Sequence, residues 1–162
     1  MRYDSKNLEA LVSVLAYLRA IKWLAWTAHW KAKGTMSYSD HLLFQRVYAG
    51  DGGGPDIDEE IDGLGERLTG LYGQDAVNPA AVTAQTSAVV QHALEEGHGD
   101  ILKSLALTEW TLSAAILAAV RSLHPDEVIM DNFLRGLVDA RSTVAYLLNQ
   151  RVTVRENRGG RQ

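Results

Sequence analysis

The segment SKNLEALVSVLAYLRAIKWLAWTAHWKAK, residues 5–33, decides the fold class of this chain. It contains neither glycine nor proline, and Leu11, Leu15 and Leu18 recur at the spacing of one helix face. At about 1.5 Å per residue such a helix extends about 43 Å, a length typical of helix bundles. Further apolar residues such as Trp23 widen its apolar surface. We therefore expect this helix to be buried on more than one side, either centrally in a bundle or against another subunit.

The composition of the chain agrees with one globular helical domain. Of its 162 residues, 46% are hydrophobic and 22% are charged, which supplies enough apolar material for a core and excludes disorder as the main state. The chain has no cysteine, which excludes disulfide scaffolds, thiolate zinc sites and thiol catalysis. Its formal charge of −4 argues against a general nucleic-acid-binding protein.

Glycine and proline positions divide the rest of the chain into further segments. Gly34 ends the first helix, and a second helix begins at Ser37 or Ser39. The pattern predicts an all-α fold with four main helices and a short extra helix between the second and third. We divide the chain into one helical domain, residues 1–150, and an arginine-rich polar tail, residues 151–162. The remaining helices are expected over residues 56–72, 80–96 and 100–123 and from Pro125 onward, with a glycine-rich interruption at residues 49–55.

Two apolar stretches resemble membrane or targeting segments only in part. The longest, residues 110–120, is too short to span a bilayer and is bounded by Glu109 and Arg121. Residues 10–18 could pass for the core of a signal peptide, but charged residues flank them on both sides and no A-x-A cleavage site follows. We therefore expect no membrane span and a cytoplasmic protein.

Four residues form a candidate metal-binding set. His29 lies near the end of the first helix and His41 near the start of the second, and a short turn between antiparallel helices can bring them together. Asp62 and Glu66 are four residues apart, so both carboxylates project from one helix face. Two imidazoles and two carboxylates suit iron, manganese or zinc. The alternative is a packed pair of histidines and a solvated acidic face.

This pattern resembles the Dps miniferritins of the ferritin-like superfamily. The resemblance rests on the sequence HWKAKG at residues 29–34, on His41 twelve residues after His29, and on the Asp-x-x-x-Glu-Arg motif at residues 62–67. The helix order also matches, over roughly residues 5–150. The resemblance implies a ferritin-like four-helix bundle that assembles into a hollow shell of twelve copies.

The resemblance also implies an activity and a set of iron ligands. Dps shells are ferroxidases, which oxidise iron(II), preferably with hydrogen peroxide, store iron(III) and protect against oxidative damage. Their iron site holds one or two ions at a two-fold subunit interface, where histidines of one subunit meet carboxylates of the other. For this chain the implied catalytic and metal-binding residues are His29, His41, Asp62 and Glu66. Trp30 beside the site would either take up stray oxidising equivalents or simply pack in the core.

The chain departs from the Dps pattern in two places. Gln45 stands four residues after His41, where the family has an aspartate, and a neutral amide is a poorer iron ligand. Asp40 is no substitute because it points about 100° away on a helix. From Gln45 to Asp62 the chain is also longer than in the family, so residues 50–55 must loop out if the site is to form.

The chain has two further groups of acidic and histidine residues. The seven acidic residues between positions 51 and 66 form an acidic run, which is either a solvated face or a funnel for iron(II). Within it, Asp58 could supply the oxygen ligand that Gln45 lacks. His92, Glu95 and His98 have ferritin-like spacing on one helix only, which favours a surface role. The acidic run comprises Asp51, Asp56, Asp58, Glu59, Glu60, Asp62 and Glu66.

DNA binding is a separate hypothesis. The residues before the first helix are nearly neutral, whereas the tail has a charge of +3 and could bind phosphates without reading sequence. A frayed, solvated tail is the alternative. Two further readings therefore stand beside the ferroxidase, namely a structural shell with weakened iron chemistry and a nucleoid-associated protein that acts through its tail. The tail arginines are Arg151, Arg155, Arg158 and Arg161, with Glu156 among them.

Overall fold

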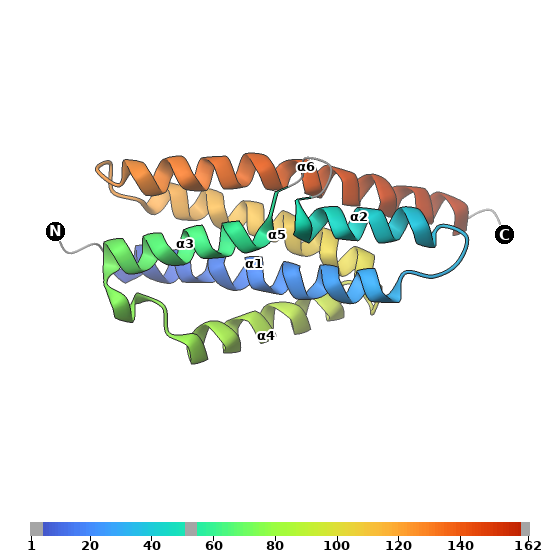
Figure 1. Ribbon diagram of the computed structural model, residues 1–162, viewed down its shortest axis with the longest axis horizontal. Helices are drawn as coiled ribbons and strands as arrows, with labels where there is room; N and C mark the ends of the chain where they lie inside the picture. Colours follow the sequence, from blue (N-terminus) through green and yellow to red (C-terminus); the bar gives the residue numbers. More distant parts are fainter. Residues whose placement is uncertain (1–4, 51–54, 160–162) are drawn as a thin grey trace.

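Six α-helices contain most of the residues that the computed structural model describes, which are residues 5–50 and 55–159 (Figure 1). Within these ranges the β-type pairing is a single isolated bridge between Ala49 and Asp56. The predicted all-α fold is therefore confirmed. The elements are α1 (Ser5–Lys31), α2 (Ser37–Ala49), α3 (Ile57–Tyr72), the 3₁₀ turn η1 (Gln74–Ala76), α4 (Pro79–Glu96), α5 (Ile101–Ser122) and α6 (Val128–Gly159).

The helices form a four-part bundle in which the second part is broken in two. α1 and α5 pack together at the centre, and α6 runs along α5. α2 and α3 follow each other along one side of α1, so that together they make the second main helix (Figure 1). α4 packs on the outside against α1 and α5 and is the extra helix that the sequence predicts.

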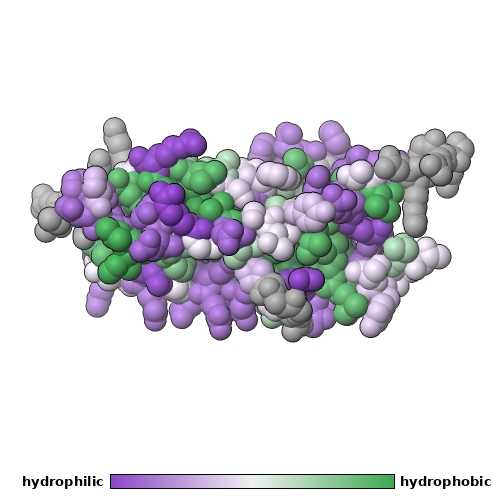
Figure 2. All heavy atoms as spheres, turned by 90° about the horizontal axis from the view of Figure 1, so that it is seen from above, coloured by the Kyte–Doolittle hydropathy of each residue, from purple (hydrophilic) through white to green (hydrophobic). Residues whose placement is uncertain are grey.

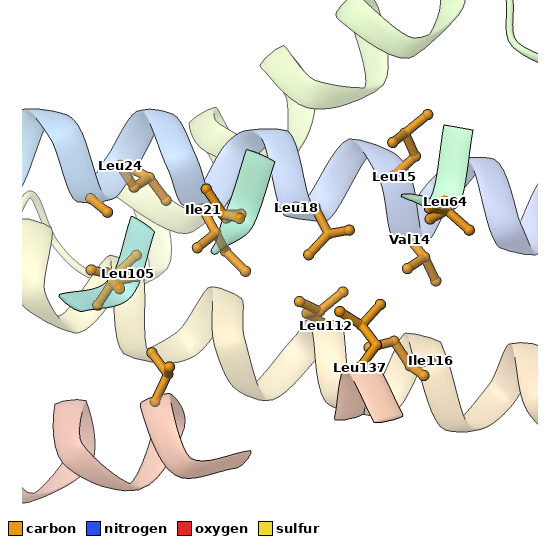
Figure 3. Close-up of a cluster of buried hydrophobic side chains, with 14 of the residues drawn as sticks. Val14, Leu15, Leu18, Ile21, Leu24, Leu64, Leu105, Leu112, Ile116 and Leu137 are labelled. Carbon is orange, nitrogen blue, oxygen red and sulfur yellow. The ribbon is translucent and has the colours of Figure 1, made fainter. Parts of the chain in front are cut away.

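The core is built from apolar side chains at helical spacing. Each fully buried leucine or isoleucine contributes about 1.5–3 kcal/mol relative to an exposed one. α1 faces both the α5–α6 side and the α3 side, which explains its wide apolar surface (Figure 3). The central cluster contains Val14, Leu15, Leu18, Ile21 and Leu24 from α1, Leu64 from α3, Leu105, Leu112 and Ile116 from α5, and Leu137 from α6.

The break between α2 and α3 has a defined end on each side. α2 ends at Ala49 and is capped by Gly50, whose φ of 67° is the left-handed conformation that glycine adopts without strain. α3 begins after Asp56, whose side chain accepts a hydrogen bond from the amide of Asp58 at 2.9 Å. The bridge between Ala49 and Asp56 brings the two ends together. α2 and α3 are therefore separated between Ala49 and Asp56. The prediction that residues 50–55 loop out falls mostly on residues 51–54, which lie outside the described part.

The ends of α6 differ from the prediction. The helix begins at Val128 and not at Pro125. The reason is Glu127, whose buried carboxylate accepts hydrogen bonds from the His124 amide at 2.7 Å and from the Tyr72 hydroxyl at 2.6 Å. The helix also continues to Gly159, so the expected aperiodic tail is helical over residues 151–159.

Seen from above, the molecule shows apolar residues interspersed among hydrophilic ones (Figure 2).

Among the described residues, α5 alone is long and apolar enough to cross a membrane by length and composition. This helix, Ile101–Ser122, is longer than residues 110–120, the longest apolar stretch that the sequence shows. The helix nevertheless lies between α1 and α6, and Leu105, Leu112 and Ile116 are fully buried in the bundle. α5 is therefore placed as a core helix of the bundle.

Candidate functional site

His29 and His41 lie against each other at one end of the bundle, where α1 ends and α2 begins. Their ring centroids are 3.6 Å apart, and the rings are tilted by 34°. Nδ1 of His29 lies 3.3 Å from the carbonyl oxygen of His41. When Nδ1 carries the proton and donates it to this carbonyl, Nε2 keeps its lone pair for a metal ion. The predicted contact of the two histidines is confirmed.

The surroundings of His29 favour its neutral form. Burial lowers the pKa of His29 below its ordinary value, the charge of His41 lowers it further, and the hydrogen bond to the His41 backbone opposes the change. A neutral imidazole is the form that binds metal ions. The hydroxyl of Tyr48 also lies 3.5 Å from Nδ1 of His29, so α2 contacts this ring at two points.

A group of tryptophans continues from the histidine pair along α1. Trp26 stacks on Trp30 with ring centroids 6.1 Å apart, and Trp30 meets Trp23 edge-on at 6.0 Å. Trp30 is 62% exposed and Trp23 is 51% exposed. The expectation that Trp30 packs in the core is therefore wrong for the isolated chain. Its ring lies on the surface beside the site.

Asp62 and Glu66 are exposed on α3, which lies along the N-terminal half of α1 and away from His29 (Figure 1). Nowhere in the described ranges do three or more histidine, aspartate or glutamate side chains gather as a metal-binding group. One chain therefore does not bring the four candidate ligands together. The resemblance places these ligands on two subunits, so a single chain leaves the complete set untested.

Asp58, the candidate substitute for the missing aspartate, has another partner. Gln45 is half-buried on α2, one turn after His41. Asp58 forms an ion pair with Lys22, whose ammonium also lies 4.5 Å from the centre of the Trp26 ring. Asp58 is thus held within its own chain and not beside His41.

Part of the acidic run has structural roles. Asp56 caps α3, and Glu60 is paired with the buried Arg141. Asp51 lies outside the described residues. On α4 His92 and Glu95 are exposed, and the helix ends at Glu96, so the Glu95-x-x-His98 motif does not continue on a helix.

A buried charged centre was missed by the sequence analysis. Arg141 of α6 is fully buried, and Nε donates to Oε2 of Glu60 at 2.7 Å. Its Nη1 donates to Oε1 of the fully buried Glu109 at 3.1 Å and to the carbonyl of Val47 at 3.0 Å. Burial, with the charge of Glu60 adding, raises the pKa of Glu109 to about 7 although Arg141 opposes the change. Only the position of Glu109 within an otherwise apolar stretch hinted at such a centre.

The tail arginines also have partners inside the chain. Nε of Arg151 donates to Oδ1 of Asp40 at 2.5 Å, and Nη2 of Arg155 donates to Oδ2 at 2.8 Å. Asp40 is only 2% exposed. The picture of a free, solvated tail is therefore wrong for Arg151 and Arg155. The side chains of Arg158 and Arg161 lie outside the described part.

Comparisons with known proteins agree with the fold. No protein-family model matches the chain, and no curated protein matches it in sequence. Among solved structures, the chain is similar to the crystal structure of Dps92 from Deinococcus radiodurans, with a TM-score of 0.66 and 18% identity. The similarity covers 90% of this chain and 85% of that chain. The chain therefore has a Dps-like, ferritin-type fold.

Proposed function

We propose that this chain is the subunit of a Dps-like miniferritin that oxidises iron(II), preferably with hydrogen peroxide, and stores iron(III) in a shell of twelve copies. The observation that carries the proposal is the contact between His29 and His41 on a Dps-like fold. Neutral imidazoles bind iron(II), and carboxylates favour iron(III). Protection against oxidative damage in the cytoplasm is the corresponding biological role.

The proposed site is completed by a second subunit. His29 and His41 supply imidazole nitrogens, and Asp62 and Glu66 of another copy supply the carboxylates. In support, both carboxylates are exposed on α3 and lie on a different part of the chain from the histidines. Peroxide accepts two electrons and two protons to give two water molecules, so its reduction oxidises two iron(II) ions.

The surface of α1 supports association with another copy. Trp23 and Trp30 are large, apolar and more than half exposed. A groove of about 640 Å³ lies between α1 and α4 and is lined by Trp23, Val90 and Leu94 among others. Exposed apolar surface of this kind is typical of interaction sites. We propose that twelve copies assemble through contacts that include this face.

The proposal is tested by iron oxidation together with particle mass. Replacing His29, His41, Asp62 or Glu66 by alanine is expected to slow peroxide-dependent oxidation of iron(II) by roughly tenfold or more, with assembly intact. The matched control replaces the exposed pair His124 and Asp126, a histidine and a carboxylate in the turn between α5 and α6.

Wild-type protein should give a particle near twelve times 17.8 kDa by light scattering. A stable monomer, or wild-type oxidation rates in all four variants, would overturn the proposal.

The alternative function is a shell of the same fold with weakened iron chemistry, and Gln45 favours it because an amide is a poorer ligand. DNA binding through the tail stays a prediction. The tail has fewer positive charges available for phosphates than the sequence predicts, because Arg151 and Arg155 both bind Asp40. A gel shift across a salt series, with full-length protein and a chain stopped at Gln150, would test it.

A further inference from the structure

The start of α2 contacts the bundle through one buried charged side chain, Asp40, in addition to the contact of His41 with His29. The buried residues of α2 are Asp40, Phe44 and Val47, and Asp40 is the first of them. Around it Tyr38 is 76% exposed and Leu42 is 47% exposed. No side-chain hydrogen bond caps the helix at Met36. Before Leu43 and Phe44, which pack in the core, the apolar side chains of α2 are therefore exposed.

The partners of Asp40 come from the far end of the sequence. Arg151 binds it through two nitrogens, with Nε 2.5 Å from Oδ1 and Nη2 3.2 Å from Oδ2. Arg155 binds Oδ2 at 2.8 Å and also lies 3.8 Å from Oδ1 of Asp100, the cap of α5. A buried carboxylate needs such partners, because an unpaired charge is costly away from water. The final turns of α6 thus connect α2 to α5.

His41 directly follows Asp40, and its ring rests on that of His29. We infer that Arg151 and Arg155 are positioning residues for the iron site, because they hold Asp40 and thereby fix the first turns of α2 that carry His41. The inference rests on the proposed function for its purpose, whereas the contact of the two rings can be measured independently of iron oxidation. Arg151 and Arg155 of the predicted tail therefore act within the fold.

The two arginines are expected to differ in importance. Arg151 places a planar fork on both oxygens of Asp40, which a lysine ammonium cannot reproduce. Arg155 makes one hydrogen bond to Asp40, which a lysine can replace. Arg151→Lys should therefore disturb the site more than Arg155→Lys.

The test measures geometry and affinity separately. Crystal structures of the metal-free assembled protein give the distance between the His29 and His41 rings, and calorimetry with zinc(II) alone gives affinity at the pair. The double variant Arg151→Ala/Arg155→Ala should separate the rings and weaken zinc(II) binding by about tenfold or more. The matched control is Arg135→Ala, since Arg135 forms an exposed ion pair with Asp131 elsewhere on α6.

Each outcome decides the inference. Rings that stay 3.6 Å apart with unchanged zinc(II) affinity in the double variant would overturn it, as would equal effects of Arg151→Lys and Arg155→Lys. If the double variant does not fold, the two lysine variants decide. If wild-type protein binds neither zinc(II) nor iron(II) at the pair, the proposed function fails. The distance between the rings still tests the role of the arginines in that case.

Discussion

α2 and α3 follow each other along one side of α1, but they present their candidate iron ligands differently (Figure 1). α2 holds His41 in ring contact with His29 of the same chain. α3 leaves Asp62 and Glu66 exposed to solvent. In the site that we propose, one half is therefore assembled within each chain, and the other half would come from another copy.

The same two helices are joined at their break by a residue from α6. Nη1 of Arg141 donates to the carbonyl of Val47 near the end of α2, and Nε donates to Glu60 in the first turn of α3. One buried guanidinium therefore fixes the separation of the two halves. Of the substitutions considered below, one at Arg141 should therefore disturb the arrangement of α2 and α3 most.

Arg141→Ala should have the largest effect on stability. It leaves Glu60 and Glu109 without their cation, and breaking a buried ion pair typically costs about 3–5 kcal/mol. We expect a loss of that size in the free energy of unfolding, measured by chemical denaturation. Arg135→Ala on the exposed side of the same helix is the control and should change little. If both variants lose equally little free energy of unfolding, the junction of α2 and α3 does not depend on the ion pairs of Arg141.

Glu109→Gln should have a smaller effect that depends on pH. The folded protein holds a proton on Glu109 up to a pKa of about 7, above the ordinary value of 4.5, so this group stabilises the fold at low pH. That stability is lost as pH rises toward 7. Glutamine does not titrate, so wild type should lose about 1–3 kcal/mol relative to the variant between pH 5 and pH 8. Parallel stability profiles for the two proteins would contradict the raised pKa.

Gln45→Asp should have the smallest effect. It adds a carboxylate one turn after His41, on the side of α2 that carries the candidate ligand. We expect the rate of iron(II) oxidation to stay equal or to rise by a few-fold, roughly 1 kcal/mol or less, measured with peroxide at saturating iron. A clear fall in rate would show that the amide of Gln45 has a role of its own.

The sequence predicted the helices well because their signals are local. The apolar spacing of residues 5–33 and the glycines around residue 50 act within a few residues of the structure that they specify. The pairing of His29 with His41 was also predictable, since a short turn between antiparallel helices leaves few other arrangements.

The errors concern residues whose partners are distant in the sequence. Arg151 donates a hydrogen bond to Asp40, which lies 111 residues away in the sequence. Glu127 accepts one from Tyr72, which lies 55 residues away. A charged residue in a helix looks like a solvated one until its partner is known. The helical end of α6 and the buried Arg141 centre were missed for this reason.

In the proposed iron site, His29 and His41 of one subunit would combine with Asp62 and Glu66 of another. This arrangement is tested most directly by mixing two inactive chains through co-expression, one with both histidines replaced by alanine and one with both carboxylates replaced. In a two-fold pair of unlike chains, one site receives all four ligands and the other receives none. Random mixing should therefore restore about a quarter of the wild-type rate of iron(II) oxidation. Mixed shells no more active than either parent would contradict the account.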